Sequence, residues 1–373
     1  MINVRTVALT LAIVAAGGCA STPPSARDVS STVGAAVTEN GTLGNAPYRV
    51  EIPDNWNGEL VMLLHGYEPA GFPRATPWPQ NEATPVFLSQ GFAVAESAYS
   101  SQGWSVSDAL VDNEQLRSYF TGKYGKPARA YLVGFSLGGH VALASLEKYG
   151  PTYDGALSLC GINIPAAVVF DEGILTPLVA FDYLFPGVMG LAPGGLSDPE
   201  SPPMLDPETV ESALAQNESA AAILVDRLQI RREYLAGALM LNYMVLREAQ
   251  MRSEGFPADN TATAYTGFGD DAAFNNGARR YTGDQRAMRY IADAADLTGR
   301  VSKPVVLQSN NNDPTVPKRF HAVYPRLAAA AGHGGQVVSL PPVGEGHCDF
   351  SPEQILTAFG ALTTTVPRVP AKS

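Results

Sequence analysis

The sequence predicts an α/β protein with a mostly parallel central sheet and helices on both faces. Short apolar runs typical of buried strands alternate with segments of helical periodicity through much of the chain. One apolar run, residues 130–133, ends in a glycine-rich turn that leads directly into a helix-forming segment. The alternation stops over residues 162–282 and then resumes, so we expect a largely helical cap inserted between two strands of the sheet.

The composition is that of a globular, loop-rich enzyme. Hydrophobic residues make up 45% of the 373 residues, which is enough for a sizeable core. Charged residues are sparse at 16%, while Gly and Pro number 36 and 29, a balance that suits an exported enzyme better than a disordered chain. The net charge is −11 and no basic run occurs, so we expect no nucleic-acid partner.

Residues 1–19 have the features of an export signal. Arg5 precedes an apolar stretch, residues 6–16, that is too short to span a membrane and is followed by small residues. Residues 16–19, Ala-Gly-Gly-Cys, resemble a bacterial lipobox, in which the cysteine is lipidated, although Ala16 replaces the usual Leu. Lipidation of Cys19 would attach the protein to a membrane, and ordinary signal cleavage is the alternative. In either case we expect an exported protein that is periplasmic, envelope-anchored or secreted.

Residues 20–33 are rich in Ser, Thr and Pro and are expected to form a flexible linker. A catalytic domain of residues 34–161 and 283–365 follows, interrupted by the cap. The predicted strands are residues 35–39, 48–52, 59–64, 92–98, 130–133, 155–161, 304–308 and 336–340. The predicted helices of this domain are residues 84–90, 108–123, 139–149, 285–296, 318–331 and 352–362.

Each kind of element has its own local signal. Asn40-Gly41 is a turn signal between the first two strands, with a connection longer than a tight hairpin. Residues 59–64 are almost wholly apolar, as in a strand buried on both faces. Residues 108–123 place apolar side chains on one side of a helix. Gly150-Pro151 ends the helix that begins near residue 139.

The cap, residues 162–282, has no clear strand pattern. Its first half is apolar and rich in Pro and Gly, and its second half is helical over residues 207–217 and 219–251. An apolar stripe runs along these helices from Ile223 to Leu246. We expect this stripe mainly to pack the cap rather than to contact a substrate.

Ser136 is the candidate nucleophile. It lies in Gly134-Phe-Ser-Leu-Gly138, a G-x-S-x-G pattern between a predicted strand and a predicted helix. In that context the pattern predicts a nucleophile elbow, a strained turn that exposes the serine Oγ while the two glycines avoid collisions. The pattern alone also occurs by chance, and a glycine-rich packing turn is the alternative.

A serine nucleophile needs a base and an acid that orients the base. Of the five histidines, His347 follows the last predicted strand on a glycine-rich loop, which favours it as the base. Asp313 follows the preceding strand and is the candidate acid, although Asp-Pro is also good turn chemistry. Asp349 is too close to His347 in sequence to be preferred.

The oxyanion hole is expected at two backbone N–H groups. Leu137 follows the nucleophile at the start of a helix, and Tyr67 follows His65-Gly66 at the end of the third strand. Gly66 permits a close approach of the backbone, and the ring of Tyr67 could line the pocket.

These motifs resemble the α/β-hydrolase superfamily. The segments His65-Gly-Tyr67, Gly134–Gly138, Asp313–Pro317 and Gly346-His347 occur in the order and strand context of that superfamily, and the similarity extends over residues 35–365. The cap lies where members often have a lid. The segment Asn-Trp-Asn-Gly, residues 55–58, is similar to a group of bacterial secreted α/β-hydrolases described as esterases or peptidase-like. The resemblance implies an α/β-hydrolase fold and acyl-transfer chemistry.

Cys160 and Cys348 remain once Cys19 is lipidated or removed. Cys160 ends the strand beside the elbow strand, and Cys348 follows His347, so both are expected at the carboxyl end of the sheet. In an oxidising compartment, two remaining cysteines often pair. We therefore predict a disulfide that steadies the histidine loop.

The predicted function is a serine hydrolase that cleaves small-molecule carboxylic esters through an acyl-enzyme intermediate. Tyr99 and Trp104 are candidates for substrate binding, because aromatic rings suit an aryl or apolar ester. A peptidase, amidase or lactonase with the same triad is the alternative, and a non-catalytic envelope binding protein is a further one. No metal-ligand spacing or dinucleotide fingerprint is present, so we expect no metal and no cofactor.

Overall fold

The structure, a computed structural model, describes residues 35–293 and 295–365. The expected export signal, the linker and the lipidation candidate Cys19 lie outside the described residues. Among the helices in the described ranges, none is long and apolar enough to cross a membrane. The described residues fall within one compact unit.

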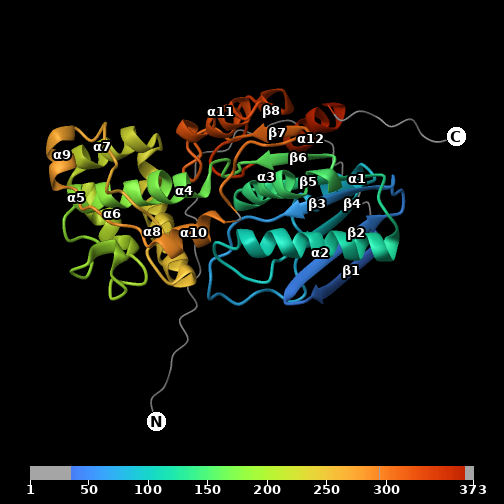
Figure 1. Ribbon diagram of the computed structural model, residues 1–373, viewed down its shortest axis with the longest axis horizontal. Coiled ribbons are helices and arrows are strands. Elements are labelled where there is room, and N and C mark those ends of the chain that lie inside the picture. Colours follow the sequence, from blue (N-terminus) through green and yellow to red (C-terminus); the bar gives the residue numbers. More distant parts are fainter. Residues whose placement is uncertain (1–34, 294, 366–373) are drawn as a thin grey trace, which may run out of the picture. The chain divides into compact units, whose positions relative to one another are not determined.

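The core of the fold is an eight-stranded sheet in the order β1-β2-β4-β3-β5-β6-β7-β8 (Figure 1). The strands are β1 (Ala35–Leu43), β2 (Ala46–Pro53), β3 (Glu59–Leu64), β4 (Ala93–Ser97), β5 (Arg129–Phe135), β6 (Gly155–Leu159), β7 (Val305–Gln308) and β8 (Val337–Leu340). The first two strands pair antiparallel with their neighbours, and the other six run parallel. The predicted mostly parallel sheet is therefore confirmed.

Helices cover both faces of the sheet, as predicted. The helices around the sheet are α1 (Thr84–Ser89), α2 (Val106–Tyr124), α3 (Leu137–Tyr149), α11 (Val323–Ala330) and α12 (Pro352–Thr365). The alternation of side chains along β3 explains the two layers, because Leu60, Met62 and Leu64 belong to one core cluster and Val61 and Leu63 to the other. Residues of α2 and α3 fill the first cluster, and residues of α1 and α12 fill the second.

The first hairpin turns later than the sequence predicts. The turn is formed by Gly44 and Asn45, so β1 and β2 are joined by a tight two-residue connection. Gly41 lies within β1, opposite Tyr48, and the Tyr48 ring lies where a Cβ of Gly41 would be. The ring covers the gap that a glycine leaves in a strand, and Gly44, at φ 58°, takes the left-handed position that a tight turn needs. The prediction of a turn at Asn40-Gly41 is therefore wrong.

Residues 162–282, here called the inserted segment, contain no strand and lie between β6 and β7. Their helices are α4 (Ala166–Val168), α5 (Thr176–Leu184), α6 (Pro207–Gln216), α7 (Glu218–Leu228), α8 (Leu235–Ser253) and α9 (Asp271–Gly277). Figure 1 shows these helices gathered to one side of the sheet. The next helix, α10 (Gln285–Ala292), packs against α4 and α8.

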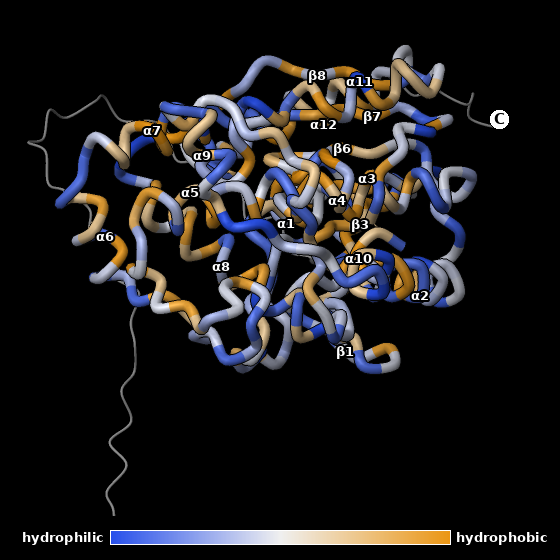
Figure 2. Tube along the Cα trace, turned by 60° about the vertical axis from the view of Figure 1, so that its left-hand side comes forward, coloured by the Kyte–Doolittle hydropathy of each residue, from blue (hydrophilic) through white to orange (hydrophobic). Residues whose placement is uncertain are grey.

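The first half of the inserted segment is helical, which its Pro/Gly-rich composition did not indicate. Between α4 and α5 the chain continues as a π-helical stretch, Val169–Leu175, so the helical path runs without a break from residue 166 to residue 184. Its apolar residues occur on every side, as in a buried helix, and orange segments mark this part in Figure 2. Residues 174–181 of this path are all buried, so this part has no amphipathic period to detect.

Two predicted helices differ most from the structure, whereas the helix expected over residues 285–296 ends four residues early, at Ala292. The helix expected over residues 219–251 is divided into α7 and α8, because Gln229 adopts a left-handed conformation (φ 56°) and ends α7. Its N–H and that of Ile230 both bond to the Val225 carbonyl, which closes the helix end. The helix expected from residue 318 begins at Val323, after one 3-10 turn, because Pro325 lacks an N–H and fits only the first turn.

Candidate active site

Ser136 lies at the tip of the turn between β5 and α3, with φ 54° and ψ −120°. A Cβ at Gly134 would lie 2.0 Å from the Gly138 carbonyl oxygen, and a Cβ at Gly138 would lie 2.0 Å from the Leu64 carbonyl oxygen. A side chain at either position would collide with the backbone, so only glycine fits this tight turn. The geometry is that of a nucleophile elbow.

The structure brings Ser136, His347 and Asp313 together in one hydrogen-bonded chain. Nε2 of His347 lies 2.9 Å from Ser136 Oγ, and Nδ1 lies 2.9 Å from Asp313 Oδ2 and 3.0 Å from Oδ1. With Nδ1 protonated, the ring donates to Asp313 and leaves Nε2 free to accept the serine proton. Among the five histidines of the chain, His347 is the one whose ring is bonded to Ser136.

The elements position these three side chains at the carboxyl end of the sheet. Ser136 follows β5, Asp313 follows β7 and His347 follows β8. Parallel strands end at the same edge, so residues 211 positions apart in sequence meet there. Asp313 is buried, with 3% of its surface exposed, whereas the His347 side chain is 25% exposed and open to a cavity.

The two predicted oxyanion residues flank Ser136. As the first residue of α3, Leu137 has an N–H without an acceptor inside the helix. A Cβ on Gly66 would lie 3.3 Å from Ser136 Cβ, so the Gly66–Tyr67 backbone runs directly past the serine. Both Tyr67 and Leu137 line the cavity. In the described part of the chain, the Tyr67 N–H has no acceptor.

His65 orients the Gly66–Tyr67 peptide, a role that the sequence did not indicate. Its Nδ1 lies 2.8 Å from the Gly66 carbonyl oxygen and can donate to it. Because the C=O and N–H of a trans peptide point in opposite directions, this bond turns the Tyr67 N–H away from His65. Burial lowers the pKa of His65 to about 4, so its ring is neutral at physiological pH.

The two aromatic candidates for substrate binding occupy different places. Trp104 lines the cavity and packs edge-on against Phe170, with ring centroids 5.1 Å apart. Tyr99 is fully buried and does not line the cavity. Its ring stacks on His65 at 4.0 Å, and its hydroxyl donates to the His65 carbonyl oxygen. Tyr99 therefore supports the loop that ends in Tyr67 from behind.

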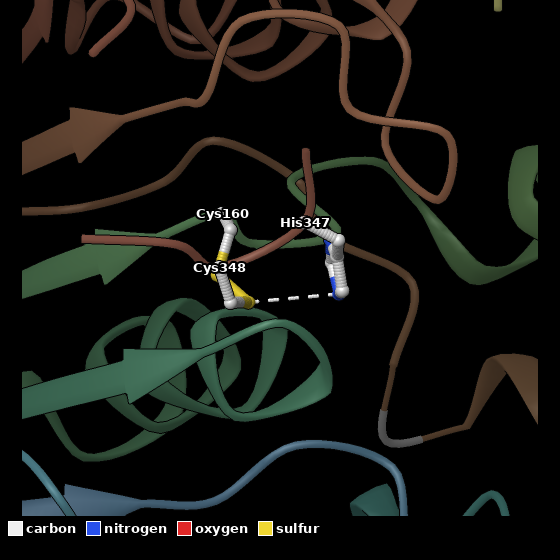
Figure 3. Close-up of side chains that lie close together, drawn as sticks. All are labelled: Cys160, His347 and Cys348. Carbon is white, nitrogen blue, oxygen red and sulfur yellow. Dashed lines mark hydrogen bonds between the residues drawn. A yellow bond between two sulfur atoms is a disulfide. The ribbon is translucent and has the colours of Figure 1, made fainter. Parts of the chain in front are cut away.

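The predicted disulfide joins Cys160, at the end of β6, to Cys348 (Figure 3). The Cys348 sulfur lies 3.5 Å from His347 Nε2. These three residues are the one group of close potential metal ligands in the described ranges. Because the two sulfurs are bonded to each other and the ring nitrogen faces Ser136, the group offers no free thiolate to a metal.

Asn310 joins the loop that contains Asp313 to the loop that contains His347, and sequence patterns did not single it out. Its side chain is buried, with 1% exposed. Its Nδ2 donates to the carbonyl oxygens of Val343 (2.9 Å) and Asp349 (3.0 Å), and its Oδ1 accepts from the Cys348 N–H (3.0 Å). All three bonds flank His347. Asn310 stands in a run of three asparagines, so nothing local distinguishes it.

A cavity of about 450 Å³ opens beside Ser136 and His347. Its wall combines the loop at Tyr67, Trp104, the π-helical stretch Val169–Leu175 and α8 of the inserted segment. Apolar side chains make up most of this wall. The inserted segment therefore forms a large part of the surface that a bound molecule would meet.

No protein-family model matches the chain. Among curated proteins, an o-phthalyl amidase from Xanthobacter agilis is 30% identical to this chain over 124 residues. The matched stretch is 31% of this chain and 26% of the amidase, so it spans about a quarter of that protein's length.

Solved structures with a similar fold include a 2-hydroxy-6-oxo-6-phenylhexa-2,4-dienoate hydrolase from Rhodococcus sp. strain RHA1, 14% identical with a TM-score of 0.42. An esterase from Pyrococcus furiosus is 13% identical with a TM-score of 0.43. Each covers 88% of this chain, and the matches take in 97% and 91% of their own chains. At this identity the likeness concerns the fold alone. The chain's own sheet, its elbow at Ser136 and the order Ser, Asp, His are those of the α/β-hydrolase fold.

Proposed function

We propose that this protein is a serine hydrolase that cleaves carboxylic esters through an acyl-enzyme intermediate. The observation that supports it most directly is the hydrogen-bonded chain from Ser136 through His347 to Asp313 at the mouth of an apolar cavity. Serine is a weak nucleophile unless a base takes its proton. In these hydrogen bonds, His347 is the candidate base and Asp313 is the group that orients it.

In the proposed mechanism, His347 removes the proton from Ser136 Oγ as the oxygen attacks the ester carbonyl carbon. The N–H groups of Tyr67 and Leu137 stabilise the negative charge that develops on the carbonyl oxygen. His347 then protonates the leaving alcohol, and a water molecule, activated by the same ring, hydrolyses the acyl-enzyme. Asp313 holds Nδ1 protonated and stabilises the imidazolium that forms in each step.

An amidase with the same machinery is the second candidate, and the partial similarity to o-phthalyl amidase favours it. Amides are poorer acyl donors than esters, because the amine leaves only after it is protonated. Both reactions use the same nucleophile, base and oxyanion hole. The two candidates differ in the leaving group, so matched substrates distinguish them.

The decisive experiment compares p-nitrophenyl butyrate with the anilide of the same acid, for wild type and Ser136→Ala. We expect hydrolysis of the ester to fall by at least about 10³-fold in Ser136→Ala, and wild type to hydrolyse the anilide much more slowly. A faster anilide reaction would favour the amidase. A protein that hydrolyses neither, and whose Ser136 does not react with a fluorophosphonate, would instead be a binding protein.

We also propose that the protein is exported and anchored through a lipid on Cys19. The disulfide between Cys160 and Cys348 supports export, because disulfides persist in oxidising compartments. Metabolic labelling with a radioactive fatty acid tests the anchor. Label should enter the wild-type protein and not Cys19→Ser, and an unlabelled wild type would favour ordinary signal cleavage.

A further inference from the structure

The wall of the active-site cavity contains no Asp, Glu, Lys or Arg among its described residues. Apart from Ser136 and His347, its side-chain polar groups are those of Tyr67, Trp104, Thr315 and Asn242, all of them uncharged. The Tyr67 hydroxyl is buried, and burial raises its pKa above the usual value. A molecule in this cavity therefore meets no Asp, Glu, Lys or Arg side chain that could form an ion pair with it.

The charged side chains behind the wall are engaged elsewhere. Glu248 accepts hydrogen bonds from the Trp104 N–H (2.9 Å) and from Arg252 Nε (2.6 Å). Arg319 lies over the Phe320 ring, 4.4 Å from its centroid, and donates to the Leu228 carbonyl oxygen. None of these three charged side chains lines the cavity.

Asn242 is the single side-chain amide in the wall. It lies on α8, and its Nδ2 donates to the Gly173 carbonyl oxygen at 3.3 Å. Within the described residues no donor bonds to its Oδ1. Asparagine and aspartate have the same shape, so Asn242 marks the position where a charge could be placed without changing the volume of the cavity.

We propose that the cavity selects uncharged substrates: it accepts esters whose acyl and alcohol parts are neutral and apolar, and it rejects those that carry a carboxylate or an ammonium group. The inference rests on the proposed function and adds the substrate class. An ionic group taken from water into an apolar site without a partner loses much of its hydration free energy.

Two matched pairs of substrates test the proposal. Choline butyrate and 3,3-dimethylbutyl butyrate have the same shape and differ by the positive charge. The p-nitrophenyl monoester of glutaric acid and p-nitrophenyl 5-methylhexanoate differ in the same way by a negative charge. We expect kcat/KM to be at least about 100-fold higher for the neutral member of each pair. Values within about threefold in either pair would overturn the proposal.

Asn242→Asp gives a gain-of-function test. A carboxylate at this position should raise kcat/KM for choline butyrate at least about tenfold relative to its neutral partner and lower it for the glutarate ester. The matched control is Asn242→Leu, which should keep the preference for neutral esters. If Asn242→Asp does not fold, Met244→Glu places a carboxylate on the same wall. An unchanged preference in a folded acidic variant would contradict the proposal.

A labelling experiment separates failure of the inference from failure of the proposed function. Ser136 is allowed to react with a neutral 3,3-dimethylbutyl fluorophosphonate and with its choline counterpart, and the two second-order rates are compared. Faster reaction with the neutral reagent, by at least about 100-fold, supports selection against charge. Equal rates keep the hydrolase and refute the selection. Reaction with neither reagent refutes the hydrolase itself.

Discussion

Asp313 performs two tasks that the sequence presented as alternatives. Its Oδ1 accepts the N–H groups of Thr315 and Val316, as an aspartate does in a tight turn. Both carboxylate oxygens also lie within 3.0 Å of Nδ1 of His347. The turn fixes the position of the Asp313 carboxylate, and the carboxylate in turn fixes the orientation of the His347 ring. A carboxylate has enough lone pairs for both sets of bonds, so neither task excludes the other.

Asp313→Asn should lower kcat for p-nitrophenyl butyrate by about 10²–10⁴-fold with little change in KM. The amide donates where the carboxylate accepts, so the ring is no longer held in the tautomer that leaves Nε2 free for Ser136. Asp349→Asn is the matched control, because the Asp349 side chain is exposed and its activity should stay within about twofold of wild type. Equal losses of kcat in the two variants would contradict a specific catalytic role of Asp313.

Glu96 is a buried carboxyl group away from the active site, with 3% of its surface exposed. Burial raises its pKa from the ordinary 4.5 to about 8, the charge of Glu51 adds to the rise, and Asn81 and Arg49 oppose it. The folded protein therefore binds this proton more tightly than the unfolded chain does. The stability contributed by Glu96 is present below about pH 4.5 and is lost as the pH rises to about 8.

Glu96→Gln should stabilise the protein at pH 8 relative to wild type, by roughly a few kcal/mol, and much less at pH 5. Glutamine keeps the shape of the protonated carboxyl group and cannot ionise. Thermal unfolding at the two pH values measures the difference in Tm. Glu82→Gln is the control, because Glu82 is exposed, and the variant should change Tm little at both pH values. A pH-independent effect of Glu96→Gln would show that Glu96 ionises normally.

The loop that contains His347 is held on two sides. The disulfide ties Cys348 to the end of β6, and Asn310 ties residues 343, 348 and 349 to the loop after β7. Backbone bonds between Asn311 and residues Gly344 and Gly346 add to the second connection. His347 and Asp313 therefore lie on two loops that are bonded to each other, which fixes the separation of the two side chains.

Asn310→Ala should lower kcat by roughly 10–100-fold while KM changes little, because small displacements of catalytic groups are costly. It leaves the Cys348 N–H and two carbonyl groups without partners, so stability should also fall by about 1–3 kcal/mol. Asn311→Ala is the matched control, since its side chain is exposed and donates one bond, to Gly344 (2.9 Å). A loss of stability with unchanged kcat would mean that Asn310 does not position His347.

The inserted segment is connected to the rest of the molecule by charged contacts as well as by apolar packing. Glu248 and Arg252 of α8 reach the loop before α2, where Arg252 bonds to Ser101 and Gln102 and Glu248 bonds to Trp104. A Cβ at Gly103 would collide with the Glu248 carboxylate, so glycine allows this close contact. Trp104 also lines the cavity. A shift of α8 would therefore move Trp104 and change the shape of the cavity.

A double-mutant cycle on Glu248→Gln and Arg252→Met should give a coupling free energy of about 1–3 kcal/mol in urea unfolding. The side chains are only 8% and 16% exposed, so solvent screens their attraction weakly. The control cycle uses Arg231 and Glu345, a pair 45% and 47% exposed, whose coupling should stay below about 1 kcal/mol. Equal coupling in the two cycles would mean that burial does not strengthen the attraction between Glu248 and Arg252.

Much of the fold and of the arrangement of the candidate site could be predicted from the sequence, because both leave local signals. The strands after which Ser136, Asp313 and His347 occur are short apolar runs, and the elbow has a fixed glycine spacing. The disulfide followed from the expectation that both cysteines lie at the carboxyl end of the sheet, in an oxidising compartment. The hairpin turn was misplaced because the packing of the Tyr48 ring over Gly41 is not visible in the hydrophobic periodicity. The start of α8 was missed because the left-handed conformation of Gln229, which ends α7, does not change that periodicity either.

The sequence by itself determined which residues can react and in what order they follow the strands. Only the tertiary structure decided what surrounds them. Asn310 and Cys348 are 38 residues apart, and Trp104 and Glu248 are 144 apart, so no local pattern relates them. The neutral wall of the cavity is likewise assembled from distant segments, of which the sequence singled out Tyr67 and Trp104 but not Asn242. Chemistry at Ser136 depends on short spacings along the chain, whereas the choice of substrate depends on which distant side chains the fold brings together.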